Sequence, residues 1–375
     1  MNEIFYKRAV RILKKIDSLI FGKVQETSFR SSQDIKVLPV FPSQIFHMPA
    51  VVDVEGRELF ASYSVDVPGA IVLEVKNGIV IVGREEVYTS DCKVIKEITA
   101  QKKNPSKGNS KRKLKKPIAL KGRILCLSLS GLERNYYHYN VEYLARHYLF
   151  KITGLEFDWV DYACETKFQK QFLKLLQIPE EKVLPDTLKG KAVTCEKLIV
   201  PGMINNWEYY AMPSGRLHHM KQYIPEWFVG VHEEFRFKNK KPIKVYISRS
   251  KADRRRVLNE CDVIDLIVKY GFVVRHMEDL SVEEQIDLFN SANKIIAPHG
   301  AGLVNMVFCS NPCQILEIYP LNYLDSSFRI LANALNFDYH CMLGEKTNLT
   351  PQDPQKENIN VNIEKLEDWL RKYCS

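Results

Sequence analysis

Apolar and polar positions recur with two different periods along the chain, and the changes of period mark the predicted elements. Residues 51–100 have the alternation of short strands, with Asn77-Gly78 as a hairpin signal between two apolar runs. From residue 121 onward, short apolar runs alternate with segments whose apolar residues recur every three or four positions. This order predicts parallel strands joined by crossover helices, and therefore an α/β fold.

The alternation is most regular after residue 242. Apolar runs at 244–249, 272–278, 294–298 and 314–320 predict strands, and the segments between them have helical spacing. One of these helices starts with capping-box spacing at Ser281 and Glu284. We expect a doubly wound sheet, in which ligands bind beyond the carboxyl ends of the strands.

The first 24 residues have a different pattern, in which apolar residues at helical spacing alternate with lysine and arginine. Such a basic amphipathic helix suits the headgroup region of an anionic membrane, and a helix packed on its own domain is the alternative. No segment has the ~20 consecutive apolar residues of a membrane span, and the start lacks the apolar core of a secretory signal.

Length and charge limit the function classes. A chain of 375 residues suggests two domains, which we place at 25–235 and 236–375 after the helix 1–24. The net charge of +9 permits an anionic ligand or a membrane surface. Segment 101–117 holds eight lysines and arginines but no aromatic residue for base stacking, so we expect a solvated loop or membrane patch and no nucleic-acid binding.

Nine cysteines are scattered without a C-x-x-C pair, which indicates no disulfide framework and a reducing compartment. Cys309 and Cys313 are four residues apart, but Asn311-Pro312 breaks any helix between them. We interpret them as small buried residues, with a two-ligand metal clip as the alternative.

A glycine-rich corner, His299-Gly300-Ala301-Gly302, separates a predicted strand from a predicted helix. Glycines allow close approach of a ligand to the backbone, and the helix start offers free N–H groups, to which His299 and Asn305 can add donors. Taken alone, the corner fits a phosphate, an oxyanion or a junction needed only for packing.

A second anion-binding corner follows the strand at 244–249. Ser248 and Arg249 end this strand, Arg254 follows in a loop, and Asn259 begins the next helix. Arginine at a strand end suits a diphosphate, although at least one of the consecutive arginines 254–256 must face solvent. Glu317 ends a further strand and can accept hydrogen bonds from a ribose, or else form a salt bridge.

These residues carry a resemblance to glycosyltransferase family 61. The similar segments are "NYYHYNVEYLARHYLF", "YISRSKADRRRVLNE", "EEQIDLFNSANKIIAPHGAGLVNMVF" and "ILEIYP". The resemblance implies two facing Rossmann-like domains of the GT-B type, with the nucleotide sugar held mainly by the C-terminal domain and the acceptor mainly by the N-terminal one. It also implies inversion at the anomeric carbon without an obligatory metal.

The chain agrees with a metal-free site, because it has no D-x-D triplet and the nearest variant, Asp53-Val54-Glu55, lies outside the similar segments. Arg249, Arg254 and the helix start after His299 are then expected to stabilise the leaving diphosphate. Inversion in one step needs a base, for which we select His138 with Glu142 one helical turn later; a structural histidine among aromatic residues is the alternative.

The sequence also bears on three rival functions. A serine hydrolase needs a G-x-S-x-G elbow, which is absent, and this also removes the oxyanion interpretation of the glycine corner. An NAD-dependent enzyme needs G-x-G-x-x-G spacing, which the corner lacks. A non-catalytic carbohydrate- or nucleotide-binding protein of the same fold stays open.

The sequence therefore predicts an inverting, metal-independent glycosyltransferase. It moves a sugar from a nucleotide-diphosphate donor, expected to be UDP-linked, to a glycan or lipid-linked saccharide in cell-surface polysaccharide synthesis. It needs no further cofactor. We expect it in the cytoplasm, with peripheral contact on the inner face of the membrane.

Overall fold

The computed structural model describes residues 26–30, 32–95, 114, 116–129, 131–202, 208–211, 218–221, 223–237, 241–310, 312–347 and 353–374. The predicted amphipathic helix 1–24 lies outside these residues, as does the basic segment 101–117 apart from residues 114, 116 and 117. Within the described part of the chain, no helix combines the length and the apolar character that crossing a membrane requires.

The C-terminal half contains a parallel five-stranded sheet with the order β19-β18-β20-β21-β22. Its strands are β18 (Ile243–Ile247), β19 (Phe272–Arg275), β20 (Ala292–Pro298), β21 (Gln314–Tyr319) and β22 (Asp338–Leu343). The chain starts at β18, adds β19 on one side, and then crosses to β20 on the other side. The strand order therefore reverses between β18 and β20, and such a switch point is where doubly wound sheets bind ligands.

Alternate residues of these strands enter two separate cores. Ile295, Ala297 and Ile315 pack in one apolar cluster, whereas Ile296, Leu316 and Ile318 pack in the other. Burial on both faces explains why the strands have continuous apolar runs. The covering helices are α5 (Glu260–Ile267), α6 (Val282–Ser291), η9 (Ala301–Phe308), α7 (Ser327–Ala334) and α8 (Ile363–Cys374), with short turns η7 (Val268–Tyr270), η8 (Met277–Asp279) and η10 (Pro354–Lys356).

Local signals set the ends of these helices. The predicted capping box of α6 is present, because the Ser281 side chain accepts from the Glu284 N–H and the Glu284 side chain accepts from the Ser281 N–H. Beyond α5 and η7 the chain turns at Gly271, whose φ of 81° lies in the left-handed region.

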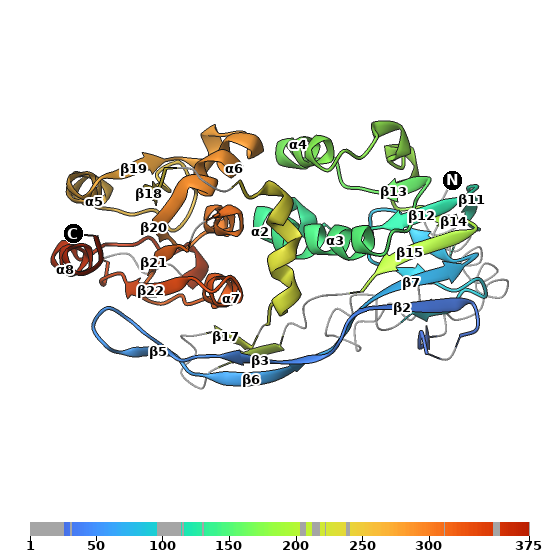
Figure 1. Cartoon of the computed structure of the whole chain (residues 1–375), viewed down its shortest axis with the longest axis horizontal. Helices are drawn as coiled ribbons and strands as arrows, with labels where there is room; N and C mark the ends of the chain where they lie inside the picture. Colours follow the sequence, from blue (N-terminus) through green and yellow to red (C-terminus); the bar gives the residue numbers. More distant parts are fainter. Residues whose placement is uncertain are drawn as a thin grey trace, which may run out of the picture.

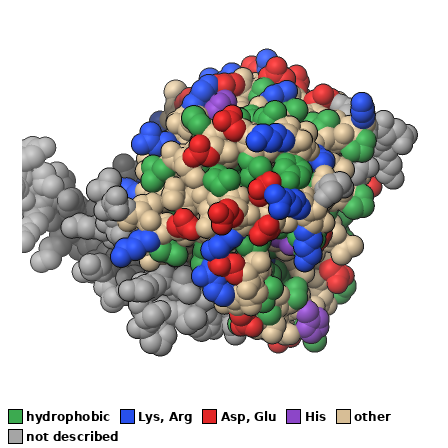
Figure 2. Space-filling view, turned by 90° about the vertical axis from the view of Figure 1, so that its left-hand side faces the viewer, with side chains coloured by type: hydrophobic (Ala, Val, Ile, Leu, Met, Phe, Trp, Pro, Cys, Tyr) green, Lys and Arg blue, Asp and Glu red, His purple; other side chains and the backbone are tan. Residues whose placement is uncertain are grey.

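At the C-terminal end of the molecule, basic and acidic side chains are interspersed over the face shown in Figure 2.

The N-terminal half holds two sheets. One is mixed, with the order β13-β12-β15-β7-β2; β13, β12 and β15 pair in parallel, and β7 is antiparallel to its neighbours β15 and β2. Its strands are β2 (Ile35–Phe41), β7 (Ala70–Lys76), β12 (Arg123–Cys126), β13 (Trp159–Asp161) and β15 (Lys197–Pro201). The other sheet contains β1 (Glu26–Thr27), β8 (Ile79–Ile81), β9 (Val87–Tyr88), β10 (Val94–Ile95), β11 (Ile118–Ala119) and β14 (Ala192–Thr194).

The hairpin prediction at Asn77-Gly78 is wrong. These residues do form a turn, but β7 before it pairs with β15 and β2, whereas β8 after it pairs with β14 and β9. The turn is therefore a corner between two sheets, because the strands on its two sides pair with other strands and not with each other.

Helices cover the mixed sheet on the side of the C-terminal half (Figure 1). The segment after β12 forms α2 (Tyr136–His138), the π-helix η3 (Tyr139–Tyr143) and α3 (Leu144–Ile152) without interruption. A π-helical turn is uncommon and often marks a functional site. The remaining helical segments are α4 (Lys167–Leu175), η2 (Leu132–Arg134), η4 (Glu180–Lys182) and η5 (Asp186–Leu188).

Two elements extend across both halves of the molecule. The helix η6 (Glu226–Phe235) stands between them in Figure 1 and contacts both α3 and η9. The second element is a long hairpin of β3 (Gln44–Met48), β4 (Val51–Val52), β5 (Glu58–Phe60) and β6 (Tyr63–Val67), which runs below both halves. A short pair, β16 (Glu208–Ala211) with β17 (His218–Lys221), completes the strands that the structure describes.

Candidate active site

The two predicted anion-binding corners lie side by side. Tyr246 of β18 pairs with Ile296 of β20, so Arg249 and His299 leave adjacent strands at the same edge of the sheet. This edge is the switch point between β18 and β20. The structure thus brings together the Ser-Arg and His-Gly blocks, which are 50 residues apart in the sequence.

The guanidinium of Arg249 lies directly on Gly300. A Cβ atom built on Gly300 would be 1.9 Å from Nη1 and 2.5 Å from Cζ of Arg249. The backbone of Gly300 is extended, with φ of 170°, so the conformation itself suits any residue. Close approach of the guanidinium is therefore the reason for glycine at this position.

Arg249 and Arg255 form a pair of guanidinium groups with unused hydrogen-bonding capacity. The Nε atom of each is buried and has no hydrogen-bond partner. Burial, followed by the positive charge of Arg255, lowers the pKa of Arg249 to about 10. Burial also lowers the pKa of Arg255. Because unpaired buried cations are costly, this arrangement favours a bound anion.

Arg255 was not singled out from the sequence, which pointed to Arg254. The Arg254 side chain is exposed and only its backbone carbonyl contacts Arg249, accepting from Nη2 at 3.0 Å. Arg255 has a φ of 55°, turns inward and lies over the Tyr323 ring at 5.5 Å. A non-glycine residue in the left-handed region is uncommon and often marks a functional site.

His299 is held by a buried carboxylate. Its Nδ1 lies 2.5 Å from Oε1 of Glu317, and Oε2 of Glu317 accepts from the hydroxyls of Tyr319 at 2.9 Å and Tyr339 at 2.5 Å. The His299 ring stacks on Tyr319, with ring centroids 5.3 Å apart, and also contacts Tyr323. The imidazole is therefore fixed in position, with Nδ1 committed to Glu317.

The sequence predicts that Glu317 contacts a ribose or forms a salt bridge, and its buried position does not suit the contact with a ribose. Its side chain is completely buried, and both carboxylate oxygens bind protein side chains. Because the side chain is buried, Glu317 can influence a ligand only through a neighbour such as His299. The sequence could not show this, because β21 is buried on both faces and the partner tyrosine Tyr339 lies on the next strand.

Three further predicted donor-site residues make contacts within the protein. Ser248 donates to Glu260 at 2.9 Å, and Asn259 pairs through its amide with the backbone of Val361. Asn305 is completely buried and accepts from the Tyr136 hydroxyl at 2.9 Å, which links η9 to α2. Ala301 and Gly302 begin η9 next to Arg249, where the first N–H groups of the helix are available.

The second histidine site faces this edge from the N-terminal half. Nδ1 of His138 lies 2.7 Å from Oε1 of Glu142, and the His138 side chain is 21% exposed. Its neighbour Tyr137 contacts Phe328 of α7, and Phe328 in turn contacts His299. The rings of Tyr137 and Phe328 therefore lie between His138 and His299. The Nδ1 atom of each histidine is bound to a carboxylate, that of Glu142 or Glu317.

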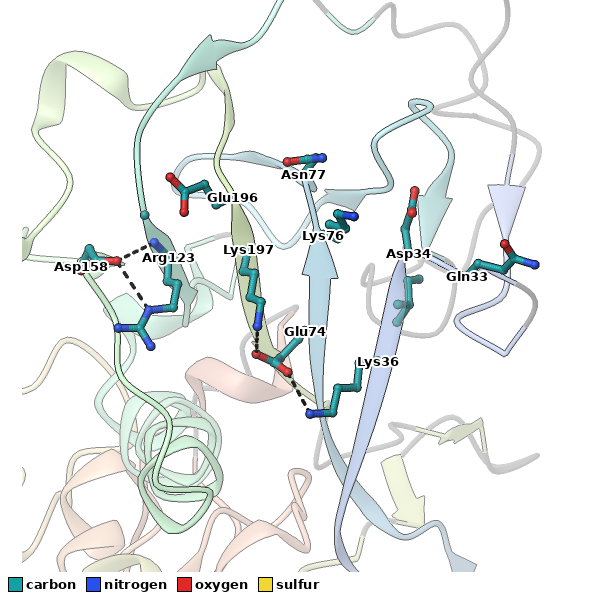
Figure 3. Close-up of a pocket in the computed structure, with 12 residues that line it drawn as sticks. Gln33, Asp34, Lys36, Glu74, Lys76, Asn77, Arg123, Asp158, Glu196 and Lys197 are labelled. Atoms are coloured by element: carbon teal, nitrogen blue, oxygen red, sulfur yellow. Dashed lines mark hydrogen bonds and ion pairs between the residues drawn. The ribbon is translucent and has the colours of Figure 1, made fainter.

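One depression lies elsewhere in the molecule. It has about 760 Å³ and is lined by residues at the amino ends of β12 and β15, away from both histidines. Figure 3 shows part of its charged lining paired, as Lys36 and Lys197 are with Glu74 and Arg123 is with Asp158. Its four basic side chains are matched in number by four acidic ones. Its charges are thus compensated within the protein, unlike those of Arg249 and Arg255.

Metal-binding groups are not gathered at the site. Among the described residues, no three histidine, cysteine, aspartate or glutamate side chains lie together as a metal would require. Asp53, in the variant triplet of the sequence, uses its carboxylate for the Arg57 guanidinium and for the Glu55 N–H. Cys309 and Cys313 are buried free thiols.

Comparison with known proteins agrees with the motifs. Residues 136–316 match the family model described as Glycosyltransferase 61. A stretch of 89 residues is 30% identical to "Beta-1,2-xylosyltransferase XYXT1" of Oryza sativa subsp. japonica, covering 24% of this chain and 19% of the rice protein. The matched region, which holds His138, Arg249 and His299, is therefore similar to glycosyltransferase family 61, in agreement with the resemblance seen in the sequence.

Proposed function

We propose that the protein is a nucleotide-sugar-dependent glycosyltransferase whose domains, 25–235 and 236–375, face each other as in the GT-B arrangement. The observation that carries this proposal is the pair of buried, unpartnered Nε atoms of Arg249 and Arg255 at the switch point. Their site is built for an anion with more than one negative group. A diphosphate held at the edge of a doubly wound sheet suits a family that transfers sugars from nucleotides.

The donor diphosphate binds between the two arginines and the first turn of η9. Arginine supplies hydrogen bonds in a fixed plane, and a helix start supplies N–H groups and partial positive charge. These groups stabilise the charge that develops on the leaving diphosphate when the glycosidic C–O bond breaks. His299, oriented by Glu317, directs Nε2 at the same phosphates.

The acceptor reacts from the side of the N-terminal half. An acceptor hydroxyl attacks the anomeric carbon, the bond to the phosphate oxygen breaks, and its electron pair leaves with the diphosphate. His138 takes the hydroxyl proton on Nε2 while Glu142 holds Nδ1 at 2.7 Å and stabilises the imidazolium. Attack opposite the leaving group inverts the anomeric carbon.

In this mechanism the arginines replace the divalent metal that many nucleotide-sugar enzymes place against the diphosphate. We propose UDP as the carrier because the rice relative is named a xylosyltransferase, and xylose is activated as its UDP derivative. The proposed acceptor is a glycan or a lipid-linked saccharide in cell-surface polysaccharide synthesis. The basic pattern of residues 1–24 supports peripheral contact with an anionic membrane on the cytoplasmic side.

A thermal-shift panel of UDP-, GDP-, CDP- and ADP-sugars tests the donor site. We expect at least one to raise the melting temperature of the wild-type protein, and Arg249→Ala and Arg255→Ala to reduce that shift. Lys36→Ala, in the distant depression, is the matched control and leaves the shift unchanged. The proposal fails if no nucleotide sugar stabilises the wild type, or if the arginine variants respond as the control does.

A turnover assay then separates an enzyme from a binding protein of the same fold. Release of nucleoside diphosphate on addition of glycan acceptors is expected for the wild type and not for His138→Gln. Stabilisation by a nucleotide sugar without release in any acceptor mixture would favour the non-catalytic alternative. Flotation with anionic liposomes, before and after removal of residues 1–24, tests the membrane contact; unchanged partitioning would contradict it.

A further inference from the structure

The hairpin of residues 44–67, which we call the arm, lies outside the family-matched region 136–316. It leaves the N-terminal half after β2 and extends along the lower side of the molecule to the C-terminal half (Figure 1). Its inner part pairs β3 with β6, and its outer part pairs β4 with β5. The arm therefore begins in one half and ends against the other.

The tip of the arm is attached to the edge of the C-terminal sheet. Asp53 forms a parallel bridge with Cys341 of β22, and the Val54 N–H donates to the Cys341 carbonyl at 3.1 Å. Glu55 forms an ion pair with Lys365 of α8 at 2.8 Å. The tip thus covers an edge strand that would otherwise expose its backbone groups.

A buried arginine of α7 binds the arm between its tip and the N-terminal half. Arg329 is 2% exposed, and its Nη2 donates to the carbonyls of Pro49 at 2.7 Å and Ala61 at 3.1 Å, one on each side of the arm. Its guanidinium carbon lies 4.8 Å from the centre of the Phe60 ring. A buried cation needs such partners, so its position fixes that of the arm.

Phe60 is connected to the donor site by contacts between side chains. Its ring is 1% exposed and lies 6.0 Å from the ring of Tyr319, in a small cluster that also contacts Tyr339. Tyr319 stacks on His299 and donates to Glu317, which in turn holds Nδ1 of His299. The arm therefore packs against Tyr319 and Tyr339, whose hydroxyls bind Glu317, and Glu317 in turn holds His299.

We propose that the arm positions His299 for the donor diphosphate, with Phe60 as the positioning residue and Arg329 as its anchor. This inference rests on the proposed function of the donor site. A smaller side chain at position 60 leaves space behind Tyr319, so Tyr319 and Glu317 move and His299 loses its fixed direction. Phe60 acts on His299 through Tyr319 and without touching the substrate.

The test compares Phe60→Leu with Phe46→Leu, a change at another buried arm phenylalanine that packs in a different cluster. Both variants should lose stability to a similar extent. Titration calorimetry with UDP should show weaker binding for Phe60→Leu only, by roughly 3- to 10-fold, a change that lies within the range of coupling between packed neighbours. Hydrogen exchange of the backbone at 299–303 should increase in Phe60→Leu and stay unchanged in Phe46→Leu. If Phe60→Leu does not fold, Phe60→Met makes the same comparison.

Equal effects of the two variants on UDP binding and on exchange at 299–303 would overturn the proposal, because the arm would then only stabilise the fold. If the wild type binds neither UDP nor another nucleoside diphosphate, the proposed function fails instead. The exchange measurement still decides the role of the arm in that case, since it needs no ligand.

Discussion

Replacing Gly300 with alanine tests the contact on which the donor site is built. The new Cβ atom would be 1.9 Å from Nη1 of Arg249, whereas an ordinary contact needs at least 3.4 Å. The guanidinium must therefore retreat by about 1.5 Å, which is 3.4 minus 1.9. The backbone suits alanine, since its φ of 170° is extended, so the effect arises from displacement of Arg249.

The displacement costs the arginine its hydrogen bond to the diphosphate. A hydrogen bond to a charged group contributes about 1.5–3 kcal/mol, and 1.4 kcal/mol is a factor of ten in affinity, so Gly300→Ala should weaken UDP binding about 10- to 150-fold. Titration calorimetry with UDP measures this change. The melting temperature without ligand shows whether the variant is folded.

A double-mutant cycle separates this cause from a general effect on the glycine corner. In the Arg249→Ala background, Gly300→Ala should change UDP affinity by less than about twofold, because the displaced group is already absent. An equal loss in both backgrounds would refute the reasoning, as would wild-type affinity in the Gly300→Ala protein.

Three more changes have defined outcomes. His138→Gln should lower kcat by about 10²- to 10⁴-fold and leave the Kd for UDP unchanged. Weaker UDP binding with an unchanged kcat would show that His138 is not the catalytic base. Glu317→Gln removes the charge that three side chains share, so it should weaken UDP binding and stability together, and an effect on neither would show that His299 does not depend on it. Burial raises the pKa of Asp161 to about 7. Because this folded-state value lies above the unfolded one, near 3.9, Asp161 weakens the fold as pH rises from about 4 to about 7, and the loss is complete above that range. Asp161→Asn keeps an acceptor for the Gly83 N–H and should make the melting temperature less dependent on pH between 5 and 8; an unchanged slope would contradict the shift.

The sequence predicts the C-terminal sheet well because its signals are local. Apolar runs, the capping box at Ser281 and the turn at Gly271 depend on residues within one or two turns of each other. Arg249 and His299 could be placed together because parallel strands put their carboxyl ends at one edge. The site residues on this edge were therefore accessible to pattern analysis.

What the sequence could not show depends on contacts across long separations. Pro49 and Arg329 are 280 residues apart, and no periodicity connects them. The choice between Arg254 and Arg255 follows from a left-handed φ at one residue in a run of three arginines. Glu317 looked available for a ligand because its tyrosine partners come from its own strand and the next one.

A structure of the protein with bound UDP tests the central claim most directly. The account predicts the diphosphate at the carboxyl ends of β18 and β20, with its oxygens within hydrogen-bond distance of the Nε atoms of Arg249 and Arg255 and of the first N–H groups of η9. A nucleotide bound at another place, such as the depression at the amino ends of β12 and β15, with both Nε atoms still unpartnered, would contradict it.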